Sequence, residues 1–498
     1  MRTTAPSDLP NHTFLFFTVL NSIYIEEPFY IKAQENPPIH TMSIKLGLER
    51  LYKYIDLNSN VFKNGIILPN TIHVAGTNGK GSICEMISSI SLKNNPDLKV
   101  GKFSSPYTVT PNDSISINNV FMDYQKYKEV NPLMEKLDMS PFEKATMKCI
   151  EYFKMNKNDY NIMEVGCGGL LDSTNIIPAT DKSLIIINKI SLDHTNLLGN
   201  TLKEIAYQKA GVINGFNEYC KVLINADNDE TQVIDTIVEQ CEKMHMKYEI
   251  VDTTDVLSIK NNEIQTFLKK KFEHSYQLGN AIIAYKAAEH LKALNEKIVL
   301  ENEQTIKAFD EFKLLGRLTK VKDYYLGSSA KQKIDFMVDG SHNNDALRDL
   351  GEYIDNVYRK SYSDQMVFVV SKTSSKDLEW KNLLRKNDIV IVTEFDNIDE
   401  MNWIKSASCD QIYQELVMNG VDPKNIILEN NIDKAITIAN ANTKFLFNSK
   451  NPEIKIFVVG SLYLAGKVFQ LQQEKLKPKG SSPQIVSTKM EKDAKKLI

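Results

Sequence analysis

The chain has 498 residues, of which 42% are hydrophobic and 25% charged, and this composition indicates a soluble globular protein of two domains. Lysine and arginine (60) nearly balance aspartate and glutamate (63), and the net charge of −3 excludes a general attraction for nucleic acid or an anionic membrane. The six cysteines form no C-x-x-C pair, which indicates free thiols in a reducing compartment rather than a disulfide framework or a zinc site.

The first 41 residues are an extension of unassigned status. Residues 14–25 are apolar but too short to span a membrane, and no small-residue cleavage pattern of a signal peptide follows them. Arginine is sparse, so a mitochondrial presequence is no better supported. An amphipathic helix opens near Met42, and we expect the working chain to begin there. The expected location is the cytoplasm, with the mitochondrion as the alternative.

Residues 71–82, T-I-H-V-A-G-T-N-G-K-G-S, have the pattern of a strand, a glycine-rich turn and the start of a helix. Glycines let backbone N–H groups approach an anion, and the helix directs its positive end at it. The spacing G-x-x-G-K-G-S departs from the usual G-x-x-x-x-G-K-[ST], so an ordinary glycine-rich turn is the alternative. The expected nucleotide ligands are Gly76, Thr77, Asn78, Gly79, Lys80, Gly81 and Ser82.

Helical periodicity alternates with short apolar runs along the chain, which predicts an α/β fold with a largely parallel sheet covered on both faces. The elements predicted first are 44–55, 71–75, 82–93, 99–103, 141–155, 160–165, 184–190, 202–213, 278–294 and 303–314. A second set predicts a smaller α/β domain, with elements at 334–338, from 344, and at 366–370, 389–392, 410–418 and 454–459. We expect domains at 42–312 and 313–472, followed by a lysine-rich tail at 473–498.

Three of the predicted strands end in polar residues. They are Ser105 in S-S-P, Glu164 in E-V-G-C-G-G, and Asp193 with His194 in S-L-D-H. Ligands of parallel sheets gather beyond the carboxyl ends of the strands, so all three groups are expected to open beside the glycine-rich loop. A carboxylate at a strand end suits a magnesium ion that bridges phosphates. The alternatives are a glycine-rich loop with an incidental exposed Glu164 and a hydrogen-bonded structural role for His194.

Three further residues stay open on the pattern alone. Lys209 in Q-K-A-G-V-I has the spacing of a helix-surface lysine. Arg317 follows Gly316 near the expected domain boundary and is either a phosphate clamp or an ordinary linker cation. His342 in D-G-S-H-N is a second histidine at a strand end, and this repetition favours a functional role for His194 and His342.

Nine motifs occur in the order found in one known family: H-V-A-G-T-N-G-K-G-S, G-K-F-S-S-P-Y, E-V-G-C-G-G-L-L-D-S-T-N, D-H-T-N-L-L-G-N-T, K-A-G-V-I, Y-Q-L-G-N-A, G-R-L, D-G-S-H-N and G-S-L-Y-L-A-G. Over residues 42–472 the chain resembles folylpolyglutamate synthases and dihydrofolate synthases, which are Mur-ligase-like ATP-dependent amide ligases. The segments S-I-S-I-N-N after Asp113 and 394–404 are more similar to fungal dihydrofolate synthases. Polyglutamating relatives carry E-R-I at the position where this chain has S-I-S-I-N-N.

The resemblance implies a Mur-ligase architecture, with an N-terminal P-loop ATPase domain and a C-terminal Rossmann-like domain that bind ATP and two magnesium ions. A monovalent cation is left open. Lys209 matches a lysine that is carbamylated in relatives. The implied ATP ligands beyond the loop are Asn280, Arg317, Asp339 and His342. The implied metal ligands are Ser105 and Glu164 for one magnesium ion and His194 for the second, and the loop pattern itself predicts the Ser82 hydroxyl as a further magnesium ligand. The implied catalytic residues are Lys80, Asp193, His194 and Lys209.

The sequence also departs from the family pattern. The departures are Leu170 in place of Arg, Gln208 in place of Glu, Tyr107 in place of His, Leu314-Leu315 in place of Trp-Pro, and Asn344 in place of Pro. None of them removes an implied ligand. Leu170 and Tyr107 nevertheless alter the details expected of the pteroate and phosphate pockets.

The implied activity joins L-glutamate to 7,8-dihydropteroate through an acyl phosphate, at the expense of ATP, in a monomer. Three alternatives stand beside it: a folylpolyglutamate synthase or bifunctional enzyme that accepts reduced folates, another Mur-type ligase, and a nucleotide-binding module without catalysis. The form of the loop together with S-S-P disfavours the second alternative. The complete set of implied metal ligands disfavours the third.

Overall fold

The structure is a computed structural model that describes residues 46–227, 231–273, 275–326, 332–359, 364–443 and 454–476. The predicted extension 1–41, the expected chain start at 42–45 and residues 477–498 of the expected tail lie outside the described residues. Residues 473–476 belong to helix α16 (Leu462–Leu476) and not to a tail. The chain from Ile44 onward forms one compact unit.

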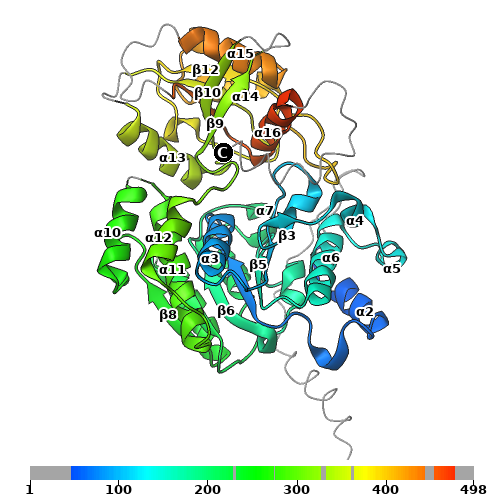
Figure 1. The fold of residues 1–498 in the computed structure, drawn as a ribbon. Helices are drawn as coiled ribbons and strands as arrows, with labels where there is room; N and C mark the ends of the chain where they lie inside the picture. Colours follow the sequence, from blue (N-terminus) through cyan, green and yellow to red (C-terminus); the bar gives the residue numbers. More distant parts are fainter. Residues whose placement is uncertain are drawn as a thin grey trace, which may run out of the picture. The chain divides into compact units, whose positions relative to one another are not determined.

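The first sheet carries the glycine-rich loop at its centre (Figure 1). Its strand order is β4-β3-β2-β5-β1-β6-β7-β8, and the pairs from β2 to β8 are parallel. β3 and β4 extend the β2 edge in antiparallel pairs. The strands are β1 (Thr71–Ala75), β2 (Val100–Phe103), β3 (Ile115–Ile117), β4 (Val120–Phe121), β5 (Tyr160–Glu164), β6 (Lys182–Ile187), β7 (Lys221–Asn225) and β8 (Lys247–Val251).

Helices cover this sheet on both faces, as the packing of strand β6 shows. Leu184 and Ile186 pack with helices α3 and α11 on one face, whereas Ile185 and Ile187 pack with α8 and α9 on the other. The run from Leu184 to Ile187 is continuously apolar because successive side chains point to opposite faces and both faces are covered. The helices of this part are α2 (Glu49–Leu57), α3 (Lys80–Asn94), α4 (Tyr124–Lys128), α5 (Pro132–Lys136), α6 (Pro141–Asn156), α7 (Thr195–Leu198), α8 (Leu202–Ala210), α9 (Thr231–Lys243), α10 (Asn262–Lys271), α11 (Gln277–Leu294) and α12 (Asn302–Asp310).

The second sheet has the order β13-β12-β11-β14-β10-β9, parallel except for the antiparallel pair β9–β10. Helices α13 and α14 contribute to the core on one face, and α15 and α16 to the core on the other. The elements are β9 (Thr319–Tyr325), β10 (Lys333–Val338), α13 (Asn344–Val357), β11 (Val367–Val370), β12 (Ile389–Val392), α14 (Cys409–Met418), β13 (Ile426–Leu428), α15 (Ile432–Asn442), β14 (Ile456–Val459) and α16. Together the two sheets confirm the predicted α/β class.

Several elements are absent from the sequence prediction, among them four between residues 213 and 278, which are β7, α9, β8 and α10. The edge strand β8 reads K-Y-E-I-V and has one fully buried residue, Val251, so it lacks the apolar run that marks β6. Helix α9 is amphipathic, with Val233 and Ile237 buried, but it follows β7 after a loop that the periodicity does not delimit. The predicted helix at 44–55 is shifted, since α2 begins at Glu49.

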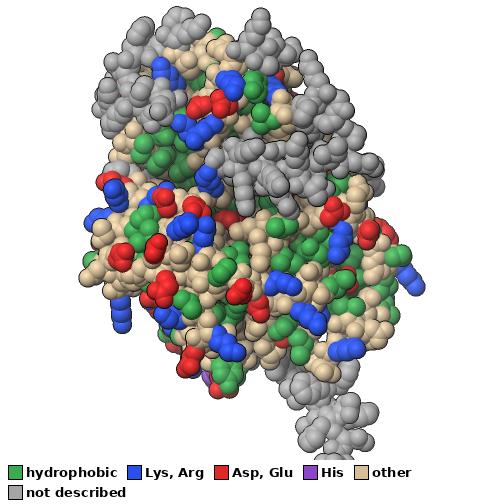
Figure 2. Space-filling model, viewed as in Figure 1, with side chains coloured by type: hydrophobic (Ala, Val, Ile, Leu, Met, Phe, Trp, Pro, Cys, Tyr) green, Lys and Arg blue, Asp and Glu red, His purple; other side chains and the backbone are tan. Residues whose placement is uncertain are grey.

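The surface matches the balanced charge of the sequence. On the face shown in Figure 2, acidic and basic side chains are interspersed and do not gather by sign. Within the described residues, no helix is long and apolar enough to cross a membrane. The six cysteines are free thiols, and five of them are buried.

Candidate active site

The glycine-rich loop joins the end of β1 to the start of α3. Gly76 and Gly79 have φ angles of +143° and +82°, which side-chain-bearing residues rarely adopt. A Cβ atom at Gly79 would lie 2.1 Å from Asn280 Oδ1, so the close approach of α11 also requires glycine there. The Lys80 ammonium donates hydrogen bonds to the carbonyls of Gly76 and Thr77, both at 3.2 Å. The loop thus places a cation beside backbone N–H groups at a helix N-terminus, a geometry that binds phosphate.

A cavity of about 480 Å³ opens at this loop. That volume is in the usual range for small-molecule sites. Except for Gly76, every residue that the sequence predicts for the site lines the cavity: Thr77, Asn78, Gly79, Lys80, Gly81, Ser82, Ser105, Glu164, Asp193, His194, Lys209, Asn280, Arg317, Asp339 and His342. The expected convergence of the strand ends is confirmed because β2, β5, β1 and β6 are parallel neighbours.

Glu164, Ser105 and Ser82 form the polar wall on the β5 side of the loop. The buried Glu164 carboxylate accepts a hydrogen bond from the backbone N–H of Ser105 at 3.2 Å. A Cβ atom on Gly81 would lie 3.4 Å from Glu164 Oε2, so the carboxylate lies directly over the loop. The Ser82 hydroxyl is buried and has no hydrogen-bond partner among the described residues.

This wall has the donor chemistry of a magnesium site. Burial raises the pKa of Glu164, although the nearby Lys80 charge opposes the shift. A carboxylate and an unpartnered hydroxyl are oxygen ligands of the kind that Mg²⁺ prefers. A cation there would neutralise the buried carboxylate and give the hydroxyl oxygen a partner. Within the described residues there is no cluster of three or more His, Cys, Asp or Glu side chains that could hold a metal, so a site here depends on the serine oxygens.

Lys209 lies inside the protein and not on the helix surface. It is 5% exposed, and its ammonium donates to the Gly76 carbonyl at 2.8 Å, the same carbonyl that Lys80 contacts. Burial, together with the charge of Lys80, lowers the pKa of Lys209 to about 7. A lysine of this kind is in part neutral near pH 7, and the neutral amine is its nucleophilic form.

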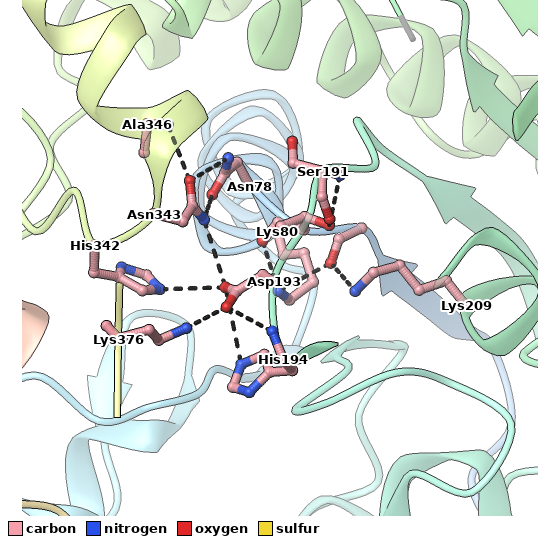
Figure 3. Close-up of polar contacts among 12 residues, drawn as sticks. Asn78, Lys80, Ser191, Asp193, His194, Lys209, His342, Asn343, Ala346 and Lys376 are labelled. Carbon is pink, nitrogen blue, oxygen red and sulfur yellow. Dashed lines mark hydrogen bonds and ion pairs between the residues drawn. The ribbon is translucent and has the colours of Figure 1, made fainter. Parts of the chain in front are cut away.

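Asp193 joins the two sheets' loops at the cavity (Figure 3). Its carboxylate pairs with the Lys376 ammonium and lies 3.9 Å from the Nε2 atoms of both His194 and His342. Asn343 Nδ2 lies 3.5 Å from Asp193 Oδ2 and donates to Asn78 Oδ1 at 2.9 Å. The loop after β10 therefore contacts both the glycine-rich loop and the loop after β6.

The pKa shifts of Asp193 and its neighbours indicate which of these groups carry a charge near neutral pH. Burial alone would raise the pKa of Asp193, but the neighbouring His194, Lys376 and His342 hold it below its usual range. Burial lowers the pKa of both histidines to about 4, so both imidazoles are neutral near pH 7. Lys376 is therefore the cation that faces the Asp193 carboxylate at neutral pH.

Two of the implied ATP ligands, Asp339 and Arg317, lie at the turn that follows β10. Asp339 is 1% exposed, and its two oxygens accept hydrogen bonds from Tyr276, Leu318 and Ser341. It is thus placed to shape the turn that carries His342. Arg317 lies against this turn, since a Cβ atom on Gly340 would be 2.9 Å from its Nη1 atom.

Sequence reasoning missed Lys376 and Asn343. Lys376 follows β11 in S-K-T-S-S-K-D, and the rule that selected Ser105 and Glu164 at strand ends would have selected this cluster too. Asn343 stands inside the motif D-G-S-H-N and caps α13 by accepting a hydrogen bond from the Ala346 N–H. Capping is the ordinary role of an Asn at that position, and it conceals the contacts with Asn78 and Asp193.

Comparisons with known proteins agree with this architecture. Residues 74–288 match the family described as Mur ligase middle domain, and residues 322–471 match the family described as dihydrofolate synthetase, C-terminal domain. The dihydrofolate synthetase of Saccharomyces cerevisiae is 31% identical over 453 residues, which cover 88% of this chain and 100% of the yeast protein.

Solved structures share the fold. A folylpolyglutamate synthase of Mycobacterium tuberculosis, complexed with ADP and AMPPCP, has a TM-score of 0.67 at 20% identity, covering 88% of this chain and 96% of its own. A bifunctional folylpolyglutamate synthase/dihydrofolate synthase of Yersinia pestis, complexed with AMPPNP and a Mn ion, has a TM-score of 0.65 at 21% identity, covering 87% and 95%. The predicted Mur-ligase architecture is confirmed, and the chain belongs to the dihydrofolate synthetase family.

Proposed function

We propose that this protein is a dihydrofolate synthase, an ATP-dependent ligase that joins L-glutamate to 7,8-dihydropteroate and releases ADP and phosphate. The observation that carries the proposal is a single cavity that combines a phosphate loop, a carboxylate–hydroxyl wall and a buried lysine, in a chain of this family. The relatives crystallised with ADP, AMPPNP and Mn support ATP with a divalent cation as its cofactors.

The chemistry follows from the poor electrophilicity of a carboxylate. A pteroate carboxylate oxygen attacks the γ-phosphorus of ATP, ADP leaves, and an acyl phosphate forms. The α-amine of glutamate then attacks the acyl carbon, loses a proton, and the C–O bond to phosphate breaks. Holding the three substrates together in one site is worth up to roughly 7–11 kcal/mol of otherwise lost entropy.

Ser82, Ser105 and Glu164 are the residues we propose for the first magnesium ion, and His194 with Lys209 for the second. Bound magnesium neutralises phosphate charge during phosphoryl transfer. Lys209 fits this assignment if its neutral amine combines with carbon dioxide, because the resulting carbamate is a carboxylate that can bind a metal.

The chain's own residues supply the remaining charge. We assign Lys80 and Arg317 to the phosphates, and we assign Asn280, Asp339 and His342 to the nucleotide across the cleft. Two domains, proposed at 42–312 and 313–472, would then close over ATP and exclude water, as lids do in many transferases. The proposed working unit is a monomer. The free thiols favour a cytoplasmic location over an oxidising compartment.

The experiment compares acceptors. We expect purified protein with Mg-ATP and L-glutamate to release phosphate on addition of dihydropteroate and to show no activity with tetrahydrofolate. Activity with tetrahydrofolate alone would contradict the proposal in favour of a folylpolyglutamate synthase, and comparable activity with both would indicate a bifunctional enzyme. Binding of ATP without phosphate release in the presence of either acceptor would indicate a nucleotide-binding module.

A further inference from the structure

A row of buried amide and hydroxyl groups runs from the edge of the first sheet to the phosphate loop. The Thr253 hydroxyl donates to Asn225 Oδ1 at 2.6 Å, and Asn225 Nδ2 donates to Asn188 Oδ1 at 2.8 Å. Asn188 Nδ2 in turn donates to the Asn78 carbonyl at 2.9 Å and to Asn280 Oδ1 at 3.0 Å. The side chains of Thr253, Asn225, Asn188 and Asn280 are 2–5% exposed. We call the first three of them the amide ladder.

Two backbone groups, one beside Asn225 and one beside Asn188, determine which side of each amide in the ladder donates and which side accepts. The N–H of Asp227 can only donate, and it donates to Asn225 Oδ1 at 2.7 Å. Asn225 must therefore present its NH₂ group to Asn188. At the other end the Asn78 carbonyl can only accept, so Asn188 must present its own NH₂ group there. Because each amide has one orientation that satisfies its neighbours, the row has a single polarity.

The last hydrogen bond of the amide ladder orients one peptide of the phosphate loop. In a trans peptide the C=O and the following N–H point in opposite directions. Holding the Asn78 carbonyl against Asn188 therefore directs the Gly79 N–H away from Asn188. Gly79 has a φ of +82°, a region in which glycine allows the preceding peptide to rotate easily. Without Asn188 this peptide could turn its carbonyl oxygen toward a bound phosphate and repel it.

We infer that the amide ladder positions the Asn78–Gly79 peptide for phosphate binding, which makes Asn225 and Thr253 positioning residues for the nucleotide. Neither belongs to a motif: Asn225 ends β7 and Thr253 follows β8, and these strands lie two and three places from β1 in the sheet. Asn188 and Asn280 also close over the loop, since a Cβ atom at Gly79 would lie 2.4 Å and 2.1 Å from them. The inference rests on the proposed binding of ATP.

The test is calorimetric titration with Mg-ADP, which does not depend on the identity of the acceptor. We expect Asn225→Leu to weaken Mg-ADP binding about tenfold, and Thr253→Val, which keeps the shape and removes the hydroxyl, to weaken it about three- to fivefold. Thr253→Ser retains the hydroxyl and should bind like the wild type. The KM for ATP should rise in the first two variants while the KM for L-glutamate stays constant.

Asn161→Leu is the matched control. Asn161 is 2% exposed and donates to the Pro69 carbonyl at 2.9 Å, at the opposite end of the same sheet. It should lower the melting temperature without changing Mg-ADP affinity. Equal loss of affinity in this control, or wild-type affinity in folded Asn225→Leu and Thr253→Val, would overturn the inference. If Asn225→Leu does not fold, the comparison of Mg-ADP affinity between Thr253→Val and Thr253→Ser tests the inference. Failure of the wild type to bind Mg-ADP would instead overturn the proposed function.

Discussion

Replacing Lys80 with alanine is expected to reduce kcat/KM for ATP roughly 100- to 1,000-fold while the protein stays folded. The Lys80 ammonium lies over the phosphate loop, 3.2 Å from the carbonyls of Gly76 and Thr77. Among the described lysines, the buried Lys209 also donates to the Gly76 carbonyl. Removing the cation leaves phosphate charge uncompensated in a site of low dielectric. The native fold should lose little, because the Lys80 side chain is only partly buried and its two hydrogen bonds go to backbone carbonyls. The measurement is steady-state kinetics with circular dichroism on the same samples.

Lys93→Ala is the control for this prediction. Lys93 lies in the last turn of the same helix, α3, and pairs at 2.5 Å with Glu311 on the surface. Exposed ion pairs of this kind contribute little, so both activity and stability should be unchanged. Near-normal turnover in Lys80→Ala, or in Glu164→Ala on the opposite wall, would contradict the assignment of the cavity as the ATP site.

Lys209→Ala is expected to lose at least 100-fold in turnover and to recover part of it on addition of formate or acetate. A short carboxylate can take the place of the carbamate that the proposal assigns to this position. Because the pKa of Lys209 is lowered to about 7, its neutral fraction rises as pH rises through 7. Wild-type enzyme depleted of carbon dioxide should therefore regain more activity from added bicarbonate at pH 8 than at pH 6.

Lys203→Ala provides the matched comparison, since Lys203 is an exposed lysine of the same helix, α8. It should show wild-type turnover and no response to carboxylates. Full activity of Lys209→Ala without rescue, or equal rescue of both variants, would contradict a carbamylated lysine.

The parts of the site that follow from local patterns could be predicted from the sequence. Glu164 ends β5, and Ser105 and Asp193 lie in the loops that follow β2 and β6. Parallel strands bring their carboxyl ends to one edge, so the convergence of these residues needed no knowledge of long-range contacts. The turn at Gly76–Gly79 likewise carries its own signal. The burial of Lys209 did not: its neighbours in Q-K-A-G-V-I suggest a surface lysine, and only the family resemblance pointed to the cavity.

Features that depend on pairs of distant residues could not be predicted in this way. The ion pair of Asp193 with Lys376 joins residues 183 positions apart, and neither residue's surroundings indicate the other. The same holds for Thr253 and Asn225, whose role depends on β7 lying beside β6 and β8 lying beside β7. Edge strand β8 was missed because Lys247 and Glu249 interrupt its apolar residues, and charged residues are common on edge strands.

Isotope transfer tests the central claim most directly. Dihydropteroate labelled with ¹⁸O in its carboxylate is incubated with the protein, Mg-ATP and L-glutamate, and the released phosphate is analysed by mass spectrometry. Activation of the carboxylate as an acyl phosphate predicts one ¹⁸O atom in the phosphate for each dihydrofolate formed, because the carboxylate oxygen leaves with the phosphoryl group. Unlabelled phosphate alongside dihydrofolate, or phosphate release without any amide product, would contradict the account.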